Sequence, residues 1–257
     1  MSSTRSGYPK APATEPGWGG ASLLLCAHGV RGEVGVAREH AAAIAALDCF
    51  ATVEACCLHG RPSLEDGLIR TAGGLTYVVP LLMAEGYSLD ALSERLAGVR
   101  ALPSSEIRLC RPVGSHPGLV ELILDRAQSQ CRSRGWRYRE SGLLLIGHGT
   151  ARHANSSQSL RCHAEALAAS RIFAGVSCAF LDQTPDVAEA LAALDSPQIV
   201  AVGHFADAGP HGADDVAAHL AGRSPQVAYA GPVGCDPGLV SLILDRVRQE
   251  EGATLAA

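Results

Sequence analysis

The sequence predicts an α/β protein built from two tandem doubly wound parallel-sheet domains that arose by internal duplication. Three observations lead to this prediction: an internal repeat, a regular alternation of strand and helix patterns, and a composition poor in aromatic residues. Hydrophobic residues make up 47% of the 257 residues, and aromatic residues only 4%. Aliphatic strands covered by helices fit this composition better than an all-β sandwich does.

The internal repeat has a constant offset at its two ends. The segment CRPVGSHPGLVELILDRAQ begins at Cys110 and returns as AGPVGCDPGLVSLILDRVR from Ala230, 120 positions later. LLLCAHGV around His28 returns as LLLIGHGT around His148 with the same offset. An offset shared across most of a domain indicates duplication. We therefore expect a flexible N-terminal tail over 1–20, a first repeat over 21–138 and a second repeat over 139–257.

Each repeat reads as an alternating series of strands and helices. In the first repeat, the expected strands are 23–27, 52–58, 75–82 and 106–111, and the expected helices are 35–47, 63–72, 89–97 and 117–134. In the second repeat, the expected strands are 143–147, 176–181, 198–205 and 226–230, and the expected helices are 155–169, 186–194, 213–221 and 237–250. Ser63 and Asp186 stand at helix starts, where N-caps belong. Strand and helix alternating in this way predict right-handed crossovers and a parallel sheet.

Charge and hydropathy exclude several classes of protein. The formal charge is -5 and the pI is near 6.0, so the basic face that nucleic-acid binding requires is not expected. No apolar stretch approaches the roughly 20 residues of a membrane helix, and residues 1–20 lack the apolar core of a secretory signal. Nine cysteines without a CxxC motif are typical of reduced thiols. We therefore expect a cytoplasmic protein without membrane or nucleic-acid partners.

Polar side chains follow the predicted strands at the carboxyl edge of each sheet, where open parallel sheets bind ligands. In strand order, these side chains are His28, His59 and Ser88 in the first repeat, and His148, Asp182 and His211 in the second. Two imidazoles and a carboxylate suit a borderline divalent metal. Imidazole also accepts protons near neutral pH. The second repeat therefore predicts a site that can handle both a metal and protons.

At the level of whole motifs, the chain resembles the CbiX and SirB group of sirohydrochlorin chelatases, within the class II chelatases, in its long form with two fused repeats. The matching segments are LLLIGHGTARHANSSQSL, CAFLDQTP, GPHGADDV and GPVGCDPGLVSLILDR, and the likeness extends from about 22 to 250. The resemblance implies that His148 and His211 bind the metal and that Asp182 takes the place of an acidic residue, usually Glu. In the first repeat, His59 replaces this acid and Ser88 replaces the histidine after the third strand, so its site is predicted to be degenerate.

The resemblance further implies a lyase that inserts Fe²⁺ or Co²⁺ into a tetrapyrrole of the sirohydrochlorin type, in sirohaem or cobalamin synthesis. Ni²⁺ suits the same nitrogen and oxygen ligands. Beyond the metal substrate no cofactor is expected, and the chain is predicted to be a monomer with two pseudo-symmetric halves. The side chains that could contact the substrate are His28, His59, Ser88, Arg152 and His204, and Arg152 could pair with its carboxylates.

Two other functions compete with this interpretation. A tetrapyrrole or metal carrier descended from a chelatase is favoured by the degenerate first repeat. A histidine-dependent phosphatase requires an RHG motif, whereas Ala27 and Gly147 precede the two His-Gly pairs, so this alternative is weaker. His204 is as compatible with a hydrogen-bonded strand histidine as with a base in the cleft.

Overall fold

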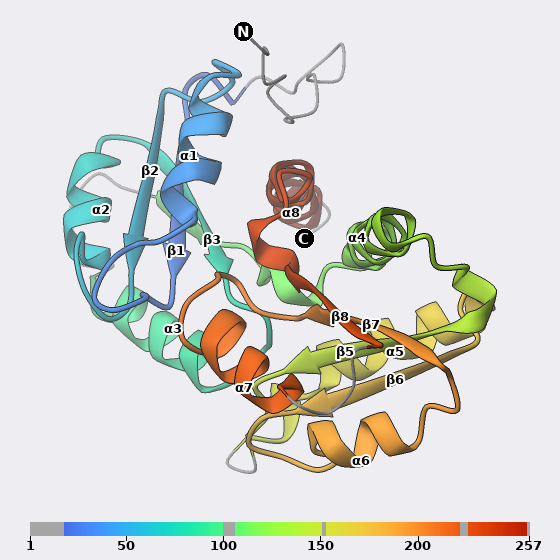
Figure 1. Cartoon of the computed structure of the whole chain (residues 1–257). Helices are drawn as coiled ribbons and strands as arrows, with labels where there is room; N and C mark the ends of the chain where they lie inside the picture. The colour runs from blue at the N-terminus through green and yellow to red at the C-terminus, as the bar shows by residue number, and fades with distance from the viewer. Residues whose placement is uncertain (1–17, 100–105, 151–152, 222–225, 256–257) are drawn as a thin grey trace, which may run out of the picture. The chain divides into compact units, whose positions relative to one another are not determined.

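Two four-stranded sheets organise the computed structural model of the chain, which describes residues 18–99, 106–150, 153–221 and 226–255 (Figure 1). The first sheet has the order β2-β1-β3-β4 and the second the order β6-β5-β7-β8. The strands of the first sheet are β1 Ser22–Ala27, β2 Thr52–Cys57, β3 Leu75–Leu81 and β4 Glu106–Leu109. The strands of the second sheet are β5 Ser141–Gly147, β6 Gly175–Phe180, β7 Gln198–Gly203 and β8 Val227–Pro232. The predicted tandem doubly wound fold is confirmed.

Helices alternate with the strands as the sequence predicts. The α-helices are α1 Ala37–Ala45, α2 Leu64–Arg70, α3 Tyr87–Val99, α4 Leu119–Arg134, α5 Gln158–Ser170, α6 Val187–Ala192, α7 Val216–Leu220 and α8 Leu239–Leu255. Short 3₁₀ turns are η1 Val113–Ser115, η2 Tyr138–Glu140, η3 Ala154–Ser156 and η5 Val233–Cys235, and η4 His211–Asp215 is a π-helical turn. Each predicted strand and helix therefore coincides with an observed element to within a few residues.

The strand pairing is parallel and places the first strand of each repeat inside its sheet. β1 pairs in parallel with β2, and β3 with β4. β5 pairs in parallel with both β6 and β7, and β7 pairs with β8. Chain connections leave the central strand in both directions, which opens a crevice at its carboxyl end. The residues that follow β1 and β5 therefore stand at the natural ligand-binding edge of each sheet.

The two predicted N-caps form complete capping boxes. Ser63 Oγ accepts a hydrogen bond from the Asp66 backbone at 3.2 Å, and Asp66 Oδ2 accepts one from the Ser63 backbone at 3.0 Å. Asp186 and Glu189 repeat this arrangement at the start of α6, with distances of 2.8 and 2.9 Å. Each box satisfies backbone donors that a helix start leaves without an intrahelical partner. The helices that follow β2 and β6 therefore begin at fixed residues close to the strand ends.

The compact units of the structure do not follow the two repeats. Unit 1 is formed by residues 1–80, 93–111 and 236–257, and unit 2 by 81–92 and 112–235. Helix α4, from the first repeat, packs in unit 2 against β7, β8 and α5. Helix α8, from the second repeat, packs in unit 1 against α1. Each unit is thus completed by the last helix of the other repeat.

Buried apolar side chains make the exchanged helices part of the two cores. Leu119 and Ile123 of α4 are fully buried, as are Ile243 and Val247 of α8. Burying a Leu or Ile side chain contributes about 1.5–3 kcal/mol. Two such residues are a large share of a domain's total stability of about 5–15 kcal/mol. Neither sheet therefore has a complete core without the exchanged helix.

The N-terminal end of the described chain belongs to unit 1. Residues 1–17 of the expected tail lie outside the described residues. Trp18, which the sequence also assigned to the tail, is buried and stacks on Phe50 with ring centroids 4.9 Å apart. Its Nε1 donates a hydrogen bond to Glu251 at 3.1 Å. The packed part of the chain therefore begins before residue 21, and it does so by contacting α8.

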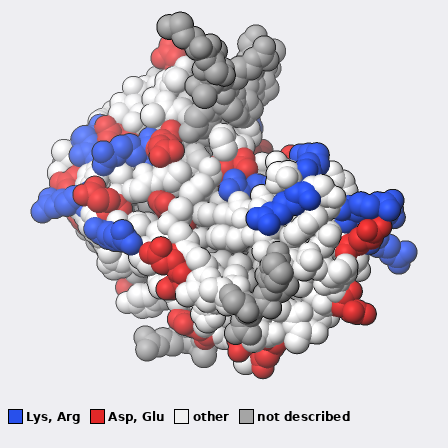
Figure 2. Space-filling view, viewed as in Figure 1, with Lys and Arg blue, Asp and Glu red and all other residues white. Residues whose placement is uncertain are grey.

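Charged side chains of both signs are interspersed on the face shown in Figure 2. This face does not present the uniformly basic surface that nucleic-acid binding calls for. Among the described residues, no helix combines the length and the apolar character needed to cross a membrane.

The helix exchange predicts that residues 139–257 expressed alone will not give a folded monomer, because the sheet of unit 2 would lack α4. Co-expression with residues 1–138 should restore a soluble complex, since each fragment supplies the other's last helix. Analytical ultracentrifugation and thermal unfolding monitored by circular dichroism measure both outcomes. A monomeric 139–257 fragment with a cooperative unfolding transition would contradict the exchange.

Candidate metal site

The turn after β5 presents His148 at the carboxyl edge of the second sheet. The His148 backbone carbonyl accepts hydrogen bonds from the backbone N–H of Leu181 at 3.0 Å and of Asp182 at 2.9 Å. Gly149 follows with a φ of 67°, and a Cβ at this position would lie 2.8 Å from the Phe180 Cβ. Only glycine adopts this backbone with so close a neighbour at low cost. The His-Gly pair therefore directs an exposed imidazole over the end of β6.

A π-helical turn presents His211, the second histidine of the candidate site. His211 is the first residue of η4, and the Asp215 backbone N–H donates to the Pro210 carbonyl at 2.9 Å. The Tyr229 hydroxyl, from β8, donates to the Gly212 carbonyl at 2.6 Å. Burial raises the pKa of Tyr229, so its hydroxyl stays protonated and remains a donor. Single π-turns of this kind are frequent at functional sites.

The imidazole rings of His148 and His211 lie together. Their centroids are 4.5 Å apart and the ring planes meet at 64°. Two imidazoles bound to one divalent ion, with metal–nitrogen bonds of about 2.1 Å, place their centroids about 4.5 to 5 Å apart. The structure therefore brings together the two predicted metal ligands at a spacing that one ion can bridge.

Hydrogen bonds at Nδ1 define which nitrogen of each ring can bind a metal. The Nδ1 of His148 lies 2.8 Å from the Gly149 carbonyl, and the Nδ1 of His211 lies 2.7 Å from Asp215 Oδ2. Carbonyl and carboxylate oxygens accept hydrogen bonds, so Nδ1 of each neutral ring carries the proton. The lone pair is then on Nε2, which has no hydrogen-bond partner among the described residues. Nε2 is therefore the atom of each ring that could bind a metal.

Asp182 stands beside His148. Its Oδ2 lies 3.4 Å from His148 Nδ1, and 63% of its side-chain surface is exposed. A carboxylate at this nitrogen orients a metal-bound imidazole and increases its basicity. Within the described chain, no three His, Cys, Asp or Glu side chains are grouped closely enough to hold a metal ion. The site therefore consists of two imidazoles, each with a carboxylate on its Nδ1 side.

Unit 1 brings together two of the three predicted side chains of the first repeat. His28 and His59 have ring centroids 5.0 Å apart, and the His59 backbone N–H donates to the His28 carbonyl at 3.1 Å. Ser88, which the sequence placed with them, lies in α3 in the segment that belongs to unit 2. Helix α3 is divided between the two units, and its residues 93–99 belong to unit 1. Arg152 lies outside the described residues.

His204 is buried rather than exposed at the site. It follows β7 directly, and only 6% of its surface is accessible. Its ring lies 5.4 Å from that of His163, and its Nε2 has no hydrogen-bond partner among the described residues. Burial, with a smaller effect of His163, lowers the pKa of His204 to about 3. At neutral pH this ring is uncharged and a weak base, and its burial disfavours direct contact with a macrocycle.

Comparison with known proteins assigns the chain to a family. The family model CbiX matches the chain twice, over residues 22–130 and 142–250. The chain belongs to the CbiX family. A relative from Halobacterium salinarum, described as a probable sirohydrochlorin cobaltochelatase, is 26% identical over 263 residues, covering 88% of this CbiX-family chain and 90% of that protein.

Solved structures have the same fold as this CbiX-family protein. The structure of CbiX described as the terminal enzyme of siroheme biosynthesis in denitrifying bacteria is 27% identical, with a TM-score of 0.73, and the match covers 89% of this chain and 98% of that one. A multi-domain protein of Deinococcus radiodurans with structural similarity to chelatases is 24% identical, with a TM-score of 0.75 over 89% of this chain. The CbiX-family chain spans about half of that larger protein, 54% of its length.

Sequence reasoning did not find Asp215 as a partner of His211. The signal lies in HGADD, where Asp215 follows His211 by four positions. Residues four apart on a helix are neighbours, and the wider π-turn places them nearly above one another. Sequence alone predicts an α-helical start here, because a π-turn has no recognised residue pattern of its own.

Replacing Asp215 with Ala should weaken Co²⁺ binding at the His148–His211 pair by about 10 to 100-fold, the usual effect of losing a carboxylate that orients a metal-bound histidine. Asp215→Asn should lose less affinity for Co²⁺, because the amide oxygen of Asn still accepts a hydrogen bond from His211 Nδ1. Titration with Co²⁺ measures the difference, with the neighbouring Asp214→Asn as control. Wild-type affinity in Asp215→Ala would show that the carboxylate does not position the ring.

The burial of His204 predicts an acid-dependent loss of stability. The unfolded chain binds a proton at His204 below a pKa of about 6.5, whereas the folded chain binds it only near pH 3. Stability should therefore fall as the pH drops from about 6.5 towards 3, by up to about 1.4 kcal/mol per pH unit. The free energy of unfolding, measured with urea, should decrease between pH 6.5 and pH 5 in the wild type. In His204→Leu this decrease should be about 2 kcal/mol smaller. Equal losses would refute this contribution.

Proposed function

We propose that the protein is a sirohydrochlorin chelatase that inserts Fe²⁺ or Co²⁺ into its tetrapyrrole substrate at the His148–His211 pair. The observation that supports this most directly is the pair itself, two imidazoles 4.5 Å apart with protonated Nδ1 atoms, in a chain whose two repeats both match the CbiX family. The resemblance seen in the sequence assigns the same two histidines to the metal.

The metal substrate would bind first to the Nε2 atoms of His148 and His211. Imidazole suits borderline divalent ions such as Fe²⁺, Co²⁺ and Ni²⁺, while Mg²⁺ and Ca²⁺ prefer oxygen ligands. Two protein nitrogens leave most coordination positions to water, so the ion can exchange these ligands for the nitrogens of the macrocycle. The carboxylates of Asp182 and Asp215 keep the rings oriented while the metal leaves.

Insertion also requires that two protons leave the pyrrole nitrogens as the metal enters. Once the metal has left His148 and His211, their Nε2 lone pairs are available as bases near neutral pH. Asp182, which is exposed beside His148, can stabilise the positive charge of that imidazole once it has accepted a proton. The reaction is then balanced, since one divalent ion replaces two protons and the charge of the macrocycle is unchanged.

The two repeats, 21–138 and 139–257, would contribute unequally to metal insertion. We propose that the site of the second repeat is the productive one, since it has both histidines and the carboxylate. The first repeat has His28 and His59 and no imidazole after its third strand. This assignment also makes the enzyme a lyase without a cofactor beyond its metal substrate.

A carrier that binds tetrapyrrole or metal without inserting it is the second candidate. The observation that favours it is the divergence of unit 1, where His59 stands in the place of the carboxylate of unit 2. A carrier would bind sirohydrochlorin tightly without accelerating metal insertion. The absorbance change of sirohydrochlorin in the presence of Fe²⁺, Co²⁺ or Ni²⁺, compared with the spontaneous rate, distinguishes the two. No acceleration with any metal would exclude the enzyme.

Replacing His148 or His211 with Ala should lower the initial rate of metal insertion by about 100-fold or more, because each removes a metal ligand and a base. Replacing His28 should lower it much less. Folding should be retained in all three variants, because residues at exposed strand ends contribute little to the core. Circular dichroism is the control for folding. An equal loss in His28→Ala would show that the reaction requires unit 1.

A further inference from the structure

Unit 1 has a second pair of imidazoles, which the proposed reaction in unit 2 does not use. His28 follows β1, His59 follows β2 by two positions, and both side chains are exposed. Their ring centroids are 5.0 Å apart and the ring planes meet at 68°. This spacing equals the separation of about 5 Å expected for two imidazoles on one tetrahedral metal ion.

Backbone contacts fix the position of each ring. The His59 backbone N–H donates to the His28 carbonyl at 3.1 Å. Gly29 has a φ of 104°, and a Cβ at this position would collide with the His59 carbonyl oxygen. The Arg61 backbone N–H donates to the Gly32 carbonyl at 2.9 Å. The two turns are therefore joined to each other directly, and the imidazoles share one support.

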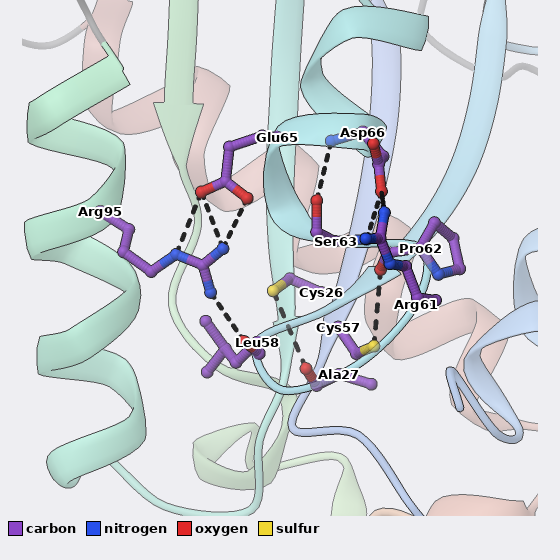
Figure 3. A network of polar contacts seen from close by, with 10 residues as sticks. All are labelled: Cys26, Ala27, Cys57, Leu58, Arg61, Pro62, Ser63, Glu65, Asp66 and Arg95. Atoms are coloured by element: carbon purple, nitrogen blue, oxygen red, sulfur yellow. Dashed lines mark hydrogen bonds and ion pairs between the residues drawn. The ribbon is translucent and has the colours of Figure 1, made fainter. Parts of the chain in front are cut away.

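Arg95 contacts both Leu58, the residue directly before His59, and Glu65 (Figure 3). Its Nη1 donates to the Leu58 carbonyl at 2.7 Å, and its Nη2 lies 2.7 Å from both carboxylate oxygens of Glu65. The Arg95 side chain lowers the pKa of Glu65, so this pair remains ionised. Arginine and carboxylate joined in this way have a defined geometry. The residue directly before His59 is thus held in place by a side chain of α3.

Cys57 provides a further attachment rather than a further ligand. Its Sγ donates to the Pro62 carbonyl at 3.4 Å, and burial raises the pKa of this thiol (Figure 3). The Cys57 side chain is fully buried and its thiol is engaged with this carbonyl, whereas both imidazoles are exposed. The donors that unit 1 offers at this place are therefore the two imidazoles.

Unit 2 has a carboxylate where unit 1 has the second imidazole. The Asp182 backbone N–H donates to the His148 carbonyl, and the His59 backbone N–H donates to the His28 carbonyl in the same way. The two turns thus share this supporting hydrogen bond and carry different side chains at the same position. A carboxylate there orients one imidazole, whereas an imidazole adds a second nitrogen donor.

We propose that unit 1 binds its own divalent transition-metal ion through His28 and His59, independently of the site in unit 2. Two nitrogen donors select ions such as Co²⁺, Ni²⁺ and Zn²⁺ over Mg²⁺, and water completes the coordination. The chain then binds one ion in each unit, by a histidine pair from different strand ends in each case. This site is distinct from the proposed catalytic one and does not depend on chelatase activity.

The test counts Co²⁺ ions bound by the full chain without a histidine tag, using isothermal titration and the visible absorbance of the ion. His148→Ala/His211→Ala removes the site of unit 2, and this variant should still bind one Co²⁺ per chain and no Mg²⁺. Adding His28→Ala and His59→Ala should abolish that binding. His219→Ala, which replaces an exposed histidine of α7, is the matched control and should leave the count unchanged.

Two results would overturn the proposal. One is a His148→Ala/His211→Ala variant that binds no Co²⁺, and the other is a variant without all four histidines that still binds it. Should the fourfold variant fail to fold, paramagnetic broadening of imidazole signals in the wild type provides the same answer. Substoichiometric Co²⁺ should broaden the signals of His28 and His59, and unaffected signals would refute the site. Neither readout depends on whether the protein inserts metal into a tetrapyrrole.

Discussion

One backbone hydrogen bond, between the turns after the first two strands of each sheet, positions one side chain of each histidine pair. The His148 carbonyl accepts from Asp182 in unit 2, and the His28 carbonyl accepts from His59 in unit 1. Parallel strands end at one edge of a sheet, and this bond fixes the separation of the two side chains that follow them. A glycine after each first histidine allows the turns to approach so closely. The chemistry of each unit then depends on which side chains occupy these positions.

The sequence predicts the scaffold well because the signals are local and occur twice. Strand and helix patterns, the capping residues Ser63 and Asp186, and the pairing of His148 with His211 all follow from periodicity, the constant offset and strand-end geometry. The role of Asp215 was missed, since it depends on a π-turn. The exchange of α4 and α8 was missed because the internal repeat shows where each helix begins and ends. It does not show whether the helix packs on the sheet of its own repeat or on that of the other. The burial of His204 was left open, because a residue directly after a buried strand can point either into the core or out of it.

The duplicated units show how a conserved backbone supports different donor sets. In unit 2, carboxylates on the Nδ1 side of both imidazoles supply negative charge that offsets the charge of a bound cation. In unit 1, the position of Asp182 holds His59, so an imidazole replaces that carboxylate. If both proposed sites bind an ion, the first would rely more on electrostatic attraction and the second mainly on nitrogen coordination.

The helix exchange has a consequence for the synthesis of the chain. The strands of the first sheet are complete by residue 109, yet α8, which completes that unit, ends at Leu255. At about 5–20 residues per second, a ribosome needs about 7 to 30 seconds to make the intervening chain. During this interval the apolar surface that α8 later covers is exposed on the nascent polypeptide. Folding of the first unit therefore waits for the synthesis of α8, and protection by chaperones would matter most during this interval.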